Sequence, residues 1–402
     1  MKNWQFLFIL FFFSGICWGS ESSCKLDKYF VKTEAYKTIA FNNKRIELEL
    51  DSNKLSLLPD LFVSVGQNIN NENSFKKPED SSVSIGVSQS IYEGNRYGKK
   101  VALLDIDKNI NNLKLEQERI QYIIRLFSAA INYQTSQQQK SLYLMQLERQ
   151  LQDLKRFEYF YTTGEVAKIE LEVAKIRVDE IKERIKKTNN ELKEVAEDIY
   201  LKYEVPEDDI KHITYNNVLN CKTKSINNIR AKQKSISLNR LYASNALDNT
   251  LFFPSVNMSI SLTPPKEGTL RTFSTEKSDF SASLNVSVPI SNFFLYNNQK
   301  SLFSVALDSL KMEITKGDRE FHQKRSAITR NSRMLRESIQ FSKSSLALKQ
   351  REVNYLLSRL RDGKETVMTY FDKLDEYNQE EIDLIRKERE FELDKVYLYF
   401  LD

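Results

Sequence analysis

The sequence contains few of the residues that interrupt helices and few of those that supply enzymatic chemistry. Among its 402 residues are only 10 glycines and 7 prolines, so long uninterrupted helices are permitted. The two histidines, His212 and His322, stand in unrelated contexts, and we expect both on the surface. Phosphate-binding loops, Cys-x-x-Cys and His-Glu-x-x-His motifs are missing. We therefore expect no catalytic site, no cofactor and no bound metal.

Charge is abundant but balanced, with 60 Lys and Arg side chains against 55 Asp and Glu side chains and a net charge of +5. An excess this small and this evenly spread does not favour nucleic acid as a partner. After the N-terminal segment, no run of about 18 apolar residues predicts a membrane-spanning helix.

The N-terminus has the parts of a secretory signal peptide. Lys2 supplies a basic start, residues 6–13 form an unbroken apolar run, and the small residues Ser14, Gly15 and Gly19 mark its end. We predict that residues 1–19 are a signal peptide cleaved near Gly19, with an uncleaved anchor as the alternative. Neither Cys17 nor Cys24 follows the lead-in of a bacterial lipoprotein signal. An exported chain of this kind can be soluble, peripheral or part of a β-barrel.

Four segments alternate between apolar and small polar residues, which is typical of strands with one apolar and one polar face. They form two pairs, each joined by a polar loop, and predict β-hairpins at residues 59–92 and 254–290. The apolar positions are Leu61, Val63, Val65 and Ile69; Val83, Ile85, Val87 and Ile91; Val256, Met258, Ile260 and Leu262; and Phe280, Ala282, Leu284, Val286, Val288 and Ile290. Most of the residues between them are serine, asparagine or glycine.

The same order of elements occurs twice along the chain. Each hairpin is followed by a proline-free helical segment, at about 95–161 and about 297–360, then by a polar turn at Gly164 or Gly363 and a second helix. At about 1.5 Å per residue, each long segment reaches roughly 100 Å. That length suits a spacer, a fibre or a tube better than a globular domain.

The two copies keep the same spacing. From Ile91 to Gly164, and from Ile290 to Gly363, the chain advances by 73 residues. We therefore divide the mature chain into two structural repeats, residues 20–220 and 221–402.

Four strands cannot close into a barrel within one chain, and an open sheet edge in a membrane would leave backbone groups unsatisfied. We therefore expect several chains to share one barrel, with eight strands from two chains, twelve from three or sixteen from four. The small polar faces suit a water-filled channel. The alternative is a soluble chain whose hairpins pack on its helices, which leaves the repeated serine-rich faces unexplained.

With these segments the chain resembles the TolC family of outer-membrane efflux and secretion channels. "LLPDLFVSVGQ" and "FFPSVNMSISL" resemble the first strands of that family, and "SIGVSQSIYEGNR" and "LNVSVPISNFF" resemble its second strands. "YTTGEVAKIEL" and "LRDGKETVMTYFD" resemble its helical-tip turns. The resemblance covers residues 25 to 402, and the duplicated order carries more weight than any single motif.

The resemblance implies a mainly α-helical fold with membrane β-structure. Long antiparallel helical hairpins would form an α-helical barrel in the periplasm, and four strands per chain would enter a shared 12-stranded, trimeric β-barrel among outer-membrane lipids. It implies a non-enzymatic exit duct in a Gram-negative bacterium, used in efflux or type I secretion. The partners would be a periplasmic adaptor (membrane fusion) protein and an inner-membrane pump or exporter. The alternative is a structural coiled-coil or adaptor protein of the cell envelope.

The resemblance also assigns candidate site residues. Tyr161, Gly164 and Gly363 would form the tips on which the adaptor docks, although Leu360 replaces an aromatic residue in the second tip. The alternative is that both glycines only end helices and have no part in docking.

In the family, acids six and nine residues after the second tip glycine line the narrowest part of the tunnel. Here these positions are Thr369 and Asp372, so we expect Asp372 at the pore constriction. Asp375 lies one turn further on, and Glu170 is the corresponding acid of the first copy. The alternative is that these acids are solvated or paired with Lys373 and Lys168.

Cys24 and Cys221 are the cysteines that remain after cleavage at Gly19. They stand 197 residues apart, at similar points of the two repeats. Because the periplasm is oxidising, a disulfide between them is a hypothesis, with two unpaired thiols as the alternative.

Overall fold

The computed structural model describes residues 24–67, 81–263 and 279–402. The predicted signal peptide and Ile69 lie outside these residues. The first half contains α1 (Asp27–Phe30), α2 (Glu34–Leu55), β1 (Asp60–Gln67), β2 (Ser81–Glu93), α3 (Arg96–Thr162) and α4 (Lys168–Tyr203). The short helices α5 (Glu207–Ile210) and α6 (Tyr215–Leu219) follow. The second half contains α7 (Ile226–Asp248), the 3₁₀ helix η2 (Asn249–Phe252), β3 (Ser255–Thr263), β4 (Asp279–Ser287), α8 (Ile290–Arg361) and α9 (Val367–Leu401).

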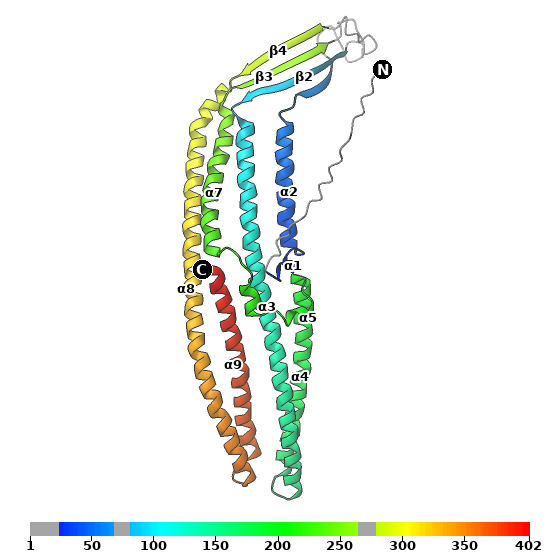
Figure 1. Ribbon diagram of the computed structural model, residues 1–402, viewed down its shortest axis with the longest axis vertical. Helices are drawn as coiled ribbons and strands as arrows, with labels where there is room; N and C mark the ends of the chain where they lie inside the picture. Colours follow the sequence, from blue (N-terminus) through cyan, green and yellow to red (C-terminus); the bar gives the residue numbers. More distant parts are fainter. Residues whose placement is uncertain (1–23, 68–80, 264–278) are drawn as a thin grey trace, which may run out of the picture.

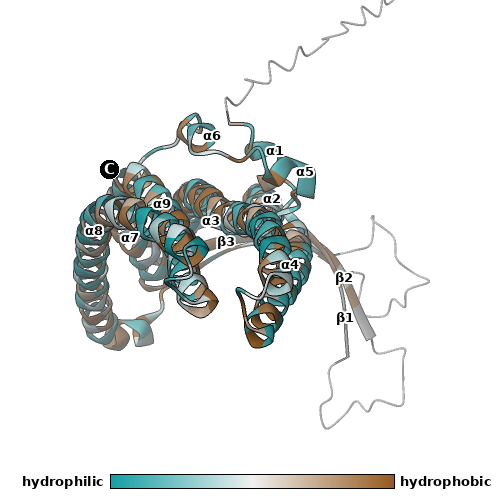
Figure 2. Ribbon diagram, turned by 90° about the horizontal axis from the view of Figure 1, so that it is seen from below, coloured by the Kyte–Doolittle hydropathy of each residue, from teal (hydrophilic) through white to brown (hydrophobic). Residues whose placement is uncertain are grey.

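The molecule is elongated, with the sheet at one end and two helical tips at the other (Figure 1). Helices α3 and α8 have 67 and 72 residues, so each is about 100 Å long or slightly more. α8 forms one lateral edge of the molecule, and α2, α4 and α5 form the other, as the view along the helices shows (Figure 2). Among the described residues, no helix is long and apolar enough to cross a membrane.

The four strands form one antiparallel sheet in the order β1-β2-β3-β4, which leaves β1 and β4 as its edges. The strand register places apolar residues opposite apolar residues and serines opposite serines, so Val63 lies opposite Ile85 and Ser259 opposite Ser283. This arrangement confirms the predicted mainly helical fold with two β-hairpins.

Two strand ends differ from the prediction. Ile91 lies in a β-bulge, and Tyr92 takes the position opposite Val256. In the second copy, β4 ends at Ser287 and α8 already begins at Ile290, so Val288 and Ile290 are not strand residues. The intervening Pro289 explains the earlier start, because proline cannot donate to a strand ladder and favours the beginning of a helix.

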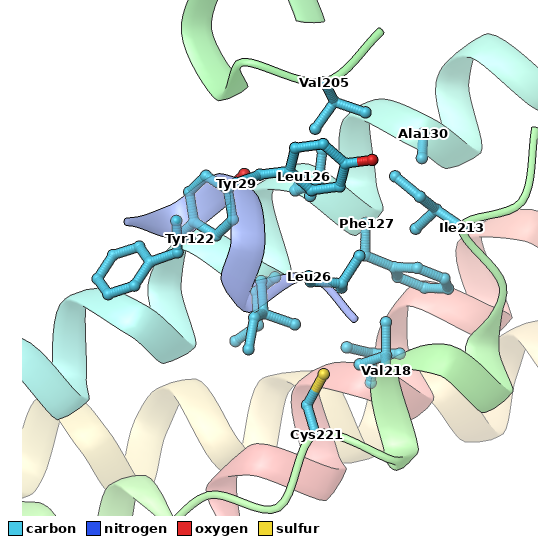
Figure 3. Packing of buried hydrophobic residues seen from close by; sticks show 14 of the residues in the cluster. Leu26, Tyr29, Tyr122, Leu126, Phe127, Ala130, Val205, Ile213, Val218 and Cys221 are labelled. Carbon is cyan, nitrogen blue, oxygen red and sulfur yellow. The ribbon is translucent and has the colours of Figure 1, made fainter. Parts of the chain in front are cut away.

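The main hydrophobic core lies halfway along the molecule, where α1, α3, α4, α9 and the segment containing α5 and α6 meet. Leu126, Phe127 and Ala130 of α3 point toward Val205, Ile213 and Val218 of that segment (Figure 3). In this core Cys24 and Cys221 form a disulfide, with a Cα–Cα distance of 4.3 Å. The first described residues of the chain are thereby joined to the crossover between the two halves.

Charged and hydroxyl groups hold α1 against the same core. Arg119 of α3 donates two hydrogen bonds of 2.7 Å to the carboxylate of Asp27. Tyr29 donates to Asp209 at the end of α5. Both contacts join residues that are more than 90 positions apart, so they define the fold rather than any local element.

Candidate functional site

Both tips end their long helices in the same way. Gly164 and Gly363 have φ of +81° and +67°, a conformation that costs glycine little. In each tip the residue after the glycine donates to the carbonyl five positions back, and the glycine donates to the carbonyl three positions back. This is the Schellman pattern of a helix C-terminus. A Cβ at either glycine would meet no atom within 4 Å, so it is the backbone conformation that favours glycine here.

The predicted tip residues therefore lie on an open surface. Tyr161 exposes 42% of its side chain, whereas Leu360, at the corresponding position of the second tip, is 8% exposed and packs in a core. The aromatic residue is thus available at the first tip alone, and the second tip uses its position for packing.

Glu170 joins the two tips. Its carboxylate accepts from the backbone N–H of Ala167, which caps α4, at 3.2 Å, and from the N–H of Val367, the first residue of α9, at 3.4 Å. Carboxylates are favourable near helix N-termini, where backbone N–H groups lack partners. One side chain of the first repeat therefore stabilises the starts of two helices, one in each repeat.

Thr369 lies beside the residue that caps the N-terminus of α9. Its N–H donates to the hydroxyl of Thr366, the N-cap of α9, at 3.2 Å, and the two hydroxyls lie 2.9 Å apart. The structure therefore places Thr369 in the first turn of α9, one turn before Asp372.

Asp372 and Asp375 both face Arg177 of α4. The guanidinium lies 3.7 Å from Asp372 and 2.6 Å from Asp375. Burial raises the pKa of the Asp375 carboxyl, and Arg177 opposes that rise. Asp372 keeps 64% of its side chain exposed, so it is the more open of the two acids.

The alternative partners considered from sequence are wrong for these acids. Lys373 contacts Glu376 at 3.0 Å and Glu352 at 3.8 Å, and Lys168 contacts Glu172 at 3.7 Å. Arg177 was missed because it lies nearly 200 positions away in the sequence.

A buried polar contact lies behind this acidic face. Tyr370 of α9 donates a hydrogen bond of 2.9 Å to Asp153 of α3, and both residues are almost fully buried. Arg156 lies 3.1 Å from the same carboxylate. Burial raises the pKa of Asp153 and that of Tyr370, and the hydrogen bond from Tyr370 partly offsets the rise for Asp153. The rings of Phe157 and Phe371 pack beside this contact at a centroid distance of 5.8 Å.

Sequence reasoning also missed Asp153. A signal was present, because Gln146, Gln150 and Asp153 follow the i, i+4, i+7 spacing of a helix face. All three are buried between the two helical hairpins. Polar residues at core spacing mark a contact between hairpins, but they do not reveal its partner.

At the opposite end, the sheet exposes large apolar side chains. Leu61, Phe280 and Leu284 are 82%, 68% and 62% exposed, and every residue of β4 is exposed. The other face carries cross-strand serine pairs, with Oγ–Oγ distances of 2.6 to 2.8 Å at Ser64–Ser84, Ser259–Ser283 and Ser261–Ser281. Within the described residues the sheet therefore has one hydroxyl-lined face and one apolar face that is exposed over most of its large side chains, although Val83 is buried.

Within the ranges that the structure covers, no group of three or more His, Cys, Asp or Glu side chains is placed to hold a metal ion. His212 and His322 are exposed.

Comparison with known proteins identifies the fold. No protein-family model and no curated protein matches the sequence. Solved structures do match. The outer membrane protein VceC from Vibrio cholerae has a TM-score of 0.73 and 8% identity, over 93% of this chain and 94% of that chain.

Two further channels match equally well. The CmeC outer membrane channel of Campylobacter jejuni has a TM-score of 0.72 and 12% identity, over 94% of this chain and 85% of its own. The open MtrE outer membrane channel of Neisseria gonorrhoeae has a TM-score of 0.72 and 10% identity, over 94% and 88%. The chain has the fold of these outer-membrane channels, as the resemblance to the TolC family predicted.

Proposed function

We propose that this chain is one subunit of an outer-membrane exit duct, in which three chains share a 12-stranded barrel and a periplasmic helical tunnel. The observation that carries the proposal is the sheet, with one exposed apolar face, one serine-lined face and two edges, β1 and β4. Lipid would cover the apolar face, and water would fill the space beside the serines.

The strand directions support closure between copies. β1 and β4 run in opposite directions because each strand is antiparallel to its neighbour. β4 of one copy can therefore pair antiparallel with β1 of the next, and the ring closes with no unpaired edge. The number three comes from the resemblance, and twelve strands leave room for an open lumen.

The helical end supports a docking role. The tips lie about 100 Å or more from the sheet, and both turns are open to solvent. A periplasmic adaptor linked to an inner-membrane pump or exporter is the partner that we propose for them. Asp372, the more exposed of the two acids facing Arg177, is the residue that we propose for the pore constriction.

The test has two parts. In detergent, native mass measurement should give three chains, and the purified protein should form conducting channels in planar bilayers. Outer-membrane fractions should retain the protein after a carbonate wash. Release by the wash together with a monomeric mass would favour the alternative, a soluble coiled-coil or adaptor protein.

A further inference from the structure

One face of α8 stays exposed from the sheet to the tip and changes character twice along its length. Residues four, seven or eleven positions apart lie on nearly the same face of a helix. Exposed residues at these spacings include Val305, Met312, Arg319, Arg330, Met334, Phe341, Leu348 and Tyr355. We call these eight residues the α8 stripe. They are apolar near the sheet, basic in the middle and apolar again toward the tip, where the exposed acids Glu337 and Glu352 lie on the same face.

The described part of the chain leaves the α8 stripe uncovered. Its apolar members are 58% to 73% exposed, whereas α8 packs on α9 through other positions, such as Leu335, Val353 and Leu356. Within residues 24–67, 81–263 and 279–402, no carboxylate forms an ion pair with Arg319 or Arg330. Arg330 instead donates to the hydroxyl of Ser326 on its own helix. A surface that covers this stripe must therefore offer apolar contacts with acidic groups at mid-height.

The opposite lateral edge offers such a surface. A hollow of about 640 Å³ lies where α4 ends and α5 begins. Its walls include Ala196, Tyr200, Leu201 and Pro206, and Tyr200 and Leu201 are 55% and 76% exposed. Glu197, Glu207 and Lys193 also line it. Glu204 and Asp208, also exposed, add negative charge beside it.

The hollow and the middle of the α8 stripe lie at the same height. Met334 lies 27 residues before the end of α8, and Ala196 lies 28 residues after the start of α4. Both positions are therefore about 40 Å above the tips, and the two tips lie at the same end of the molecule (Figure 1). Arg330 lies 31 residues before the end of α8 and Glu197 lies 29 residues after the start of α4, so these two residues also correspond in height to within about 3 Å.

Within one chain these surfaces cannot meet, because α8 and α4 form opposite lateral edges (Figure 2). Between copies they can meet. α8 follows the edge strand β4, and α2, on the same side as α4, precedes the edge strand β1. Pairing β4 with the β1 of a neighbour therefore brings the α8 stripe toward the α2 and α4 edge of that neighbour. Phe41, Leu48 and Leu55 of α2, exposed and seven residues apart, would face the upper part of the stripe.

We propose that Met334 of one copy enters the hollow beside Ala196 of the next copy, with Arg330 against Glu197. This contact rests on the proposed three-chain assembly, and it specifies which residues meet between neighbouring copies at mid-height. It is heterologous, because two different patches meet, so it builds a closed ring when the rotation between copies closes. Insertion of the Met334 side chain buries apolar surface, and the pair of Arg330 and Glu197 fixes how the two helices align along their length.

Cysteine cross-linking of the full chain in detergent tests the contact. The variant Met334→Cys with Lys193→Cys, a lining residue of the hollow at nearly the height of Met334, should give a covalent three-chain species without reductant, and each single variant should give none. A two-chain product from Met334→Cys alone would mean that the stripe meets itself, and would overturn the proposal. A wild-type chain that assembles into three while the double variant fails to cross-link would overturn this contact and leave the duct intact. A monomeric wild type would overturn both.

Charge reversal provides a second measurement. Arg330→Glu and Glu197→Arg should each raise the concentration needed for assembly by about tenfold, since a favourable pair becomes a repulsive one. The combined variant should restore assembly to near the wild-type concentration. Arg336→Glu is the matched control, because Arg336 lies on another face of α8 and its reversal should change nothing. The pairing would be overturned if Arg330→Glu and Arg336→Glu weakened assembly equally, or if combining Arg330→Glu with Glu197→Arg did not restore assembly.

Discussion

Removing one hydroxyl group, that of Tyr370, should loosen the contact between the two helical hairpins near the tips. The hydroxyl donates to Asp153 at 2.9 Å, and both residues are at most 2% exposed. Tyr370→Phe leaves the buried carboxylate with Arg156, whose side chain is 44% exposed. The lost hydrogen bond to a charged acceptor is worth about 1.5 to 3 kcal/mol, so local opening should become about 10- to 150-fold more frequent.

Hydrogen exchange measures this opening directly, because amides in the first turns of α9 and in the facing part of α3 exchange when the hairpins separate. Tyr377→Phe is the control, since among the described residues the Tyr377 hydroxyl has no hydrogen-bond partner and its removal should leave exchange unchanged. The reasoning would be refuted if amides in Tyr370→Phe were as well protected from exchange as in the wild type. It would also be refuted if Tyr370→Phe and Tyr377→Phe lost protection equally.

The dependence on pH has a definite sign. Burial raises the pKa of Asp153 in the folded protein above its ordinary value of 3.8. The folded state therefore binds a proton more readily than the unfolded state, and stability falls as pH rises from the unfolded pKa through the folded pKa. Asp153→Asn carries no charge and can still accept from Tyr370. Its protection should match or exceed that of the wild type at neutral pH and should not fall across this range.

Three further predictions concern the predicted site residues. Gly164→Ala should destabilise the first tip by about 1 kcal/mol, because its φ is +81°, and limited proteolysis should then cleave that tip faster. Cys221→Ser opens a closed loop of almost 200 residues and should lower the free energy of unfolding by up to about 5 kcal/mol; two reactive thiols in denatured, unreduced wild-type protein would contradict the disulfide. Asp372→Ala should lower cation selectivity and weaken block by multivalent cations in single-channel recordings without changing the chain count, and Thr369→Asp should strengthen both; unchanged currents would mean that Asp372 does not face the pore.

Local features of the fold were predictable because short-range patterns determine them. Alternation of serine with valine or isoleucine predicts two-faced strands, and the proline-free segments predict helices of about 100 Å. The lone glycines predicted the turns at 164 and 363, where the backbone adopts positive φ. The beginning of α8 was predicted at about residue 297 because the apolar alternation continues to Ile290, whereas Pro289 ends the second copy's strand at Ser287 and α8 begins at Ile290.

Contacts between residues distant in the chain could not be predicted from the sequence in the same way. Arg177 as the partner of Asp372 and Asp375, and Asp153 as the acceptor for Tyr370, each join residues from the two repeats nearly 200 positions or more apart. Many charged and polar side chains at helical spacing could have met these groups, and only the packing of the hairpins selects among them.

The sequence by itself determined the kinds of elements in this protein, their order and their lengths, because hydrophobic periodicity and backbone preferences act over a few residues. The tertiary structure decided which faces those elements bury and which they leave open. It joined the first described residues to the crossover through Cys24 and Cys221, and it placed the α8 stripe and the hollow at the end of α4 on opposite edges at one height. Those outcomes depend on how helices of about 100 Å pack against one another, and a change in one crossing angle would move every contact along them.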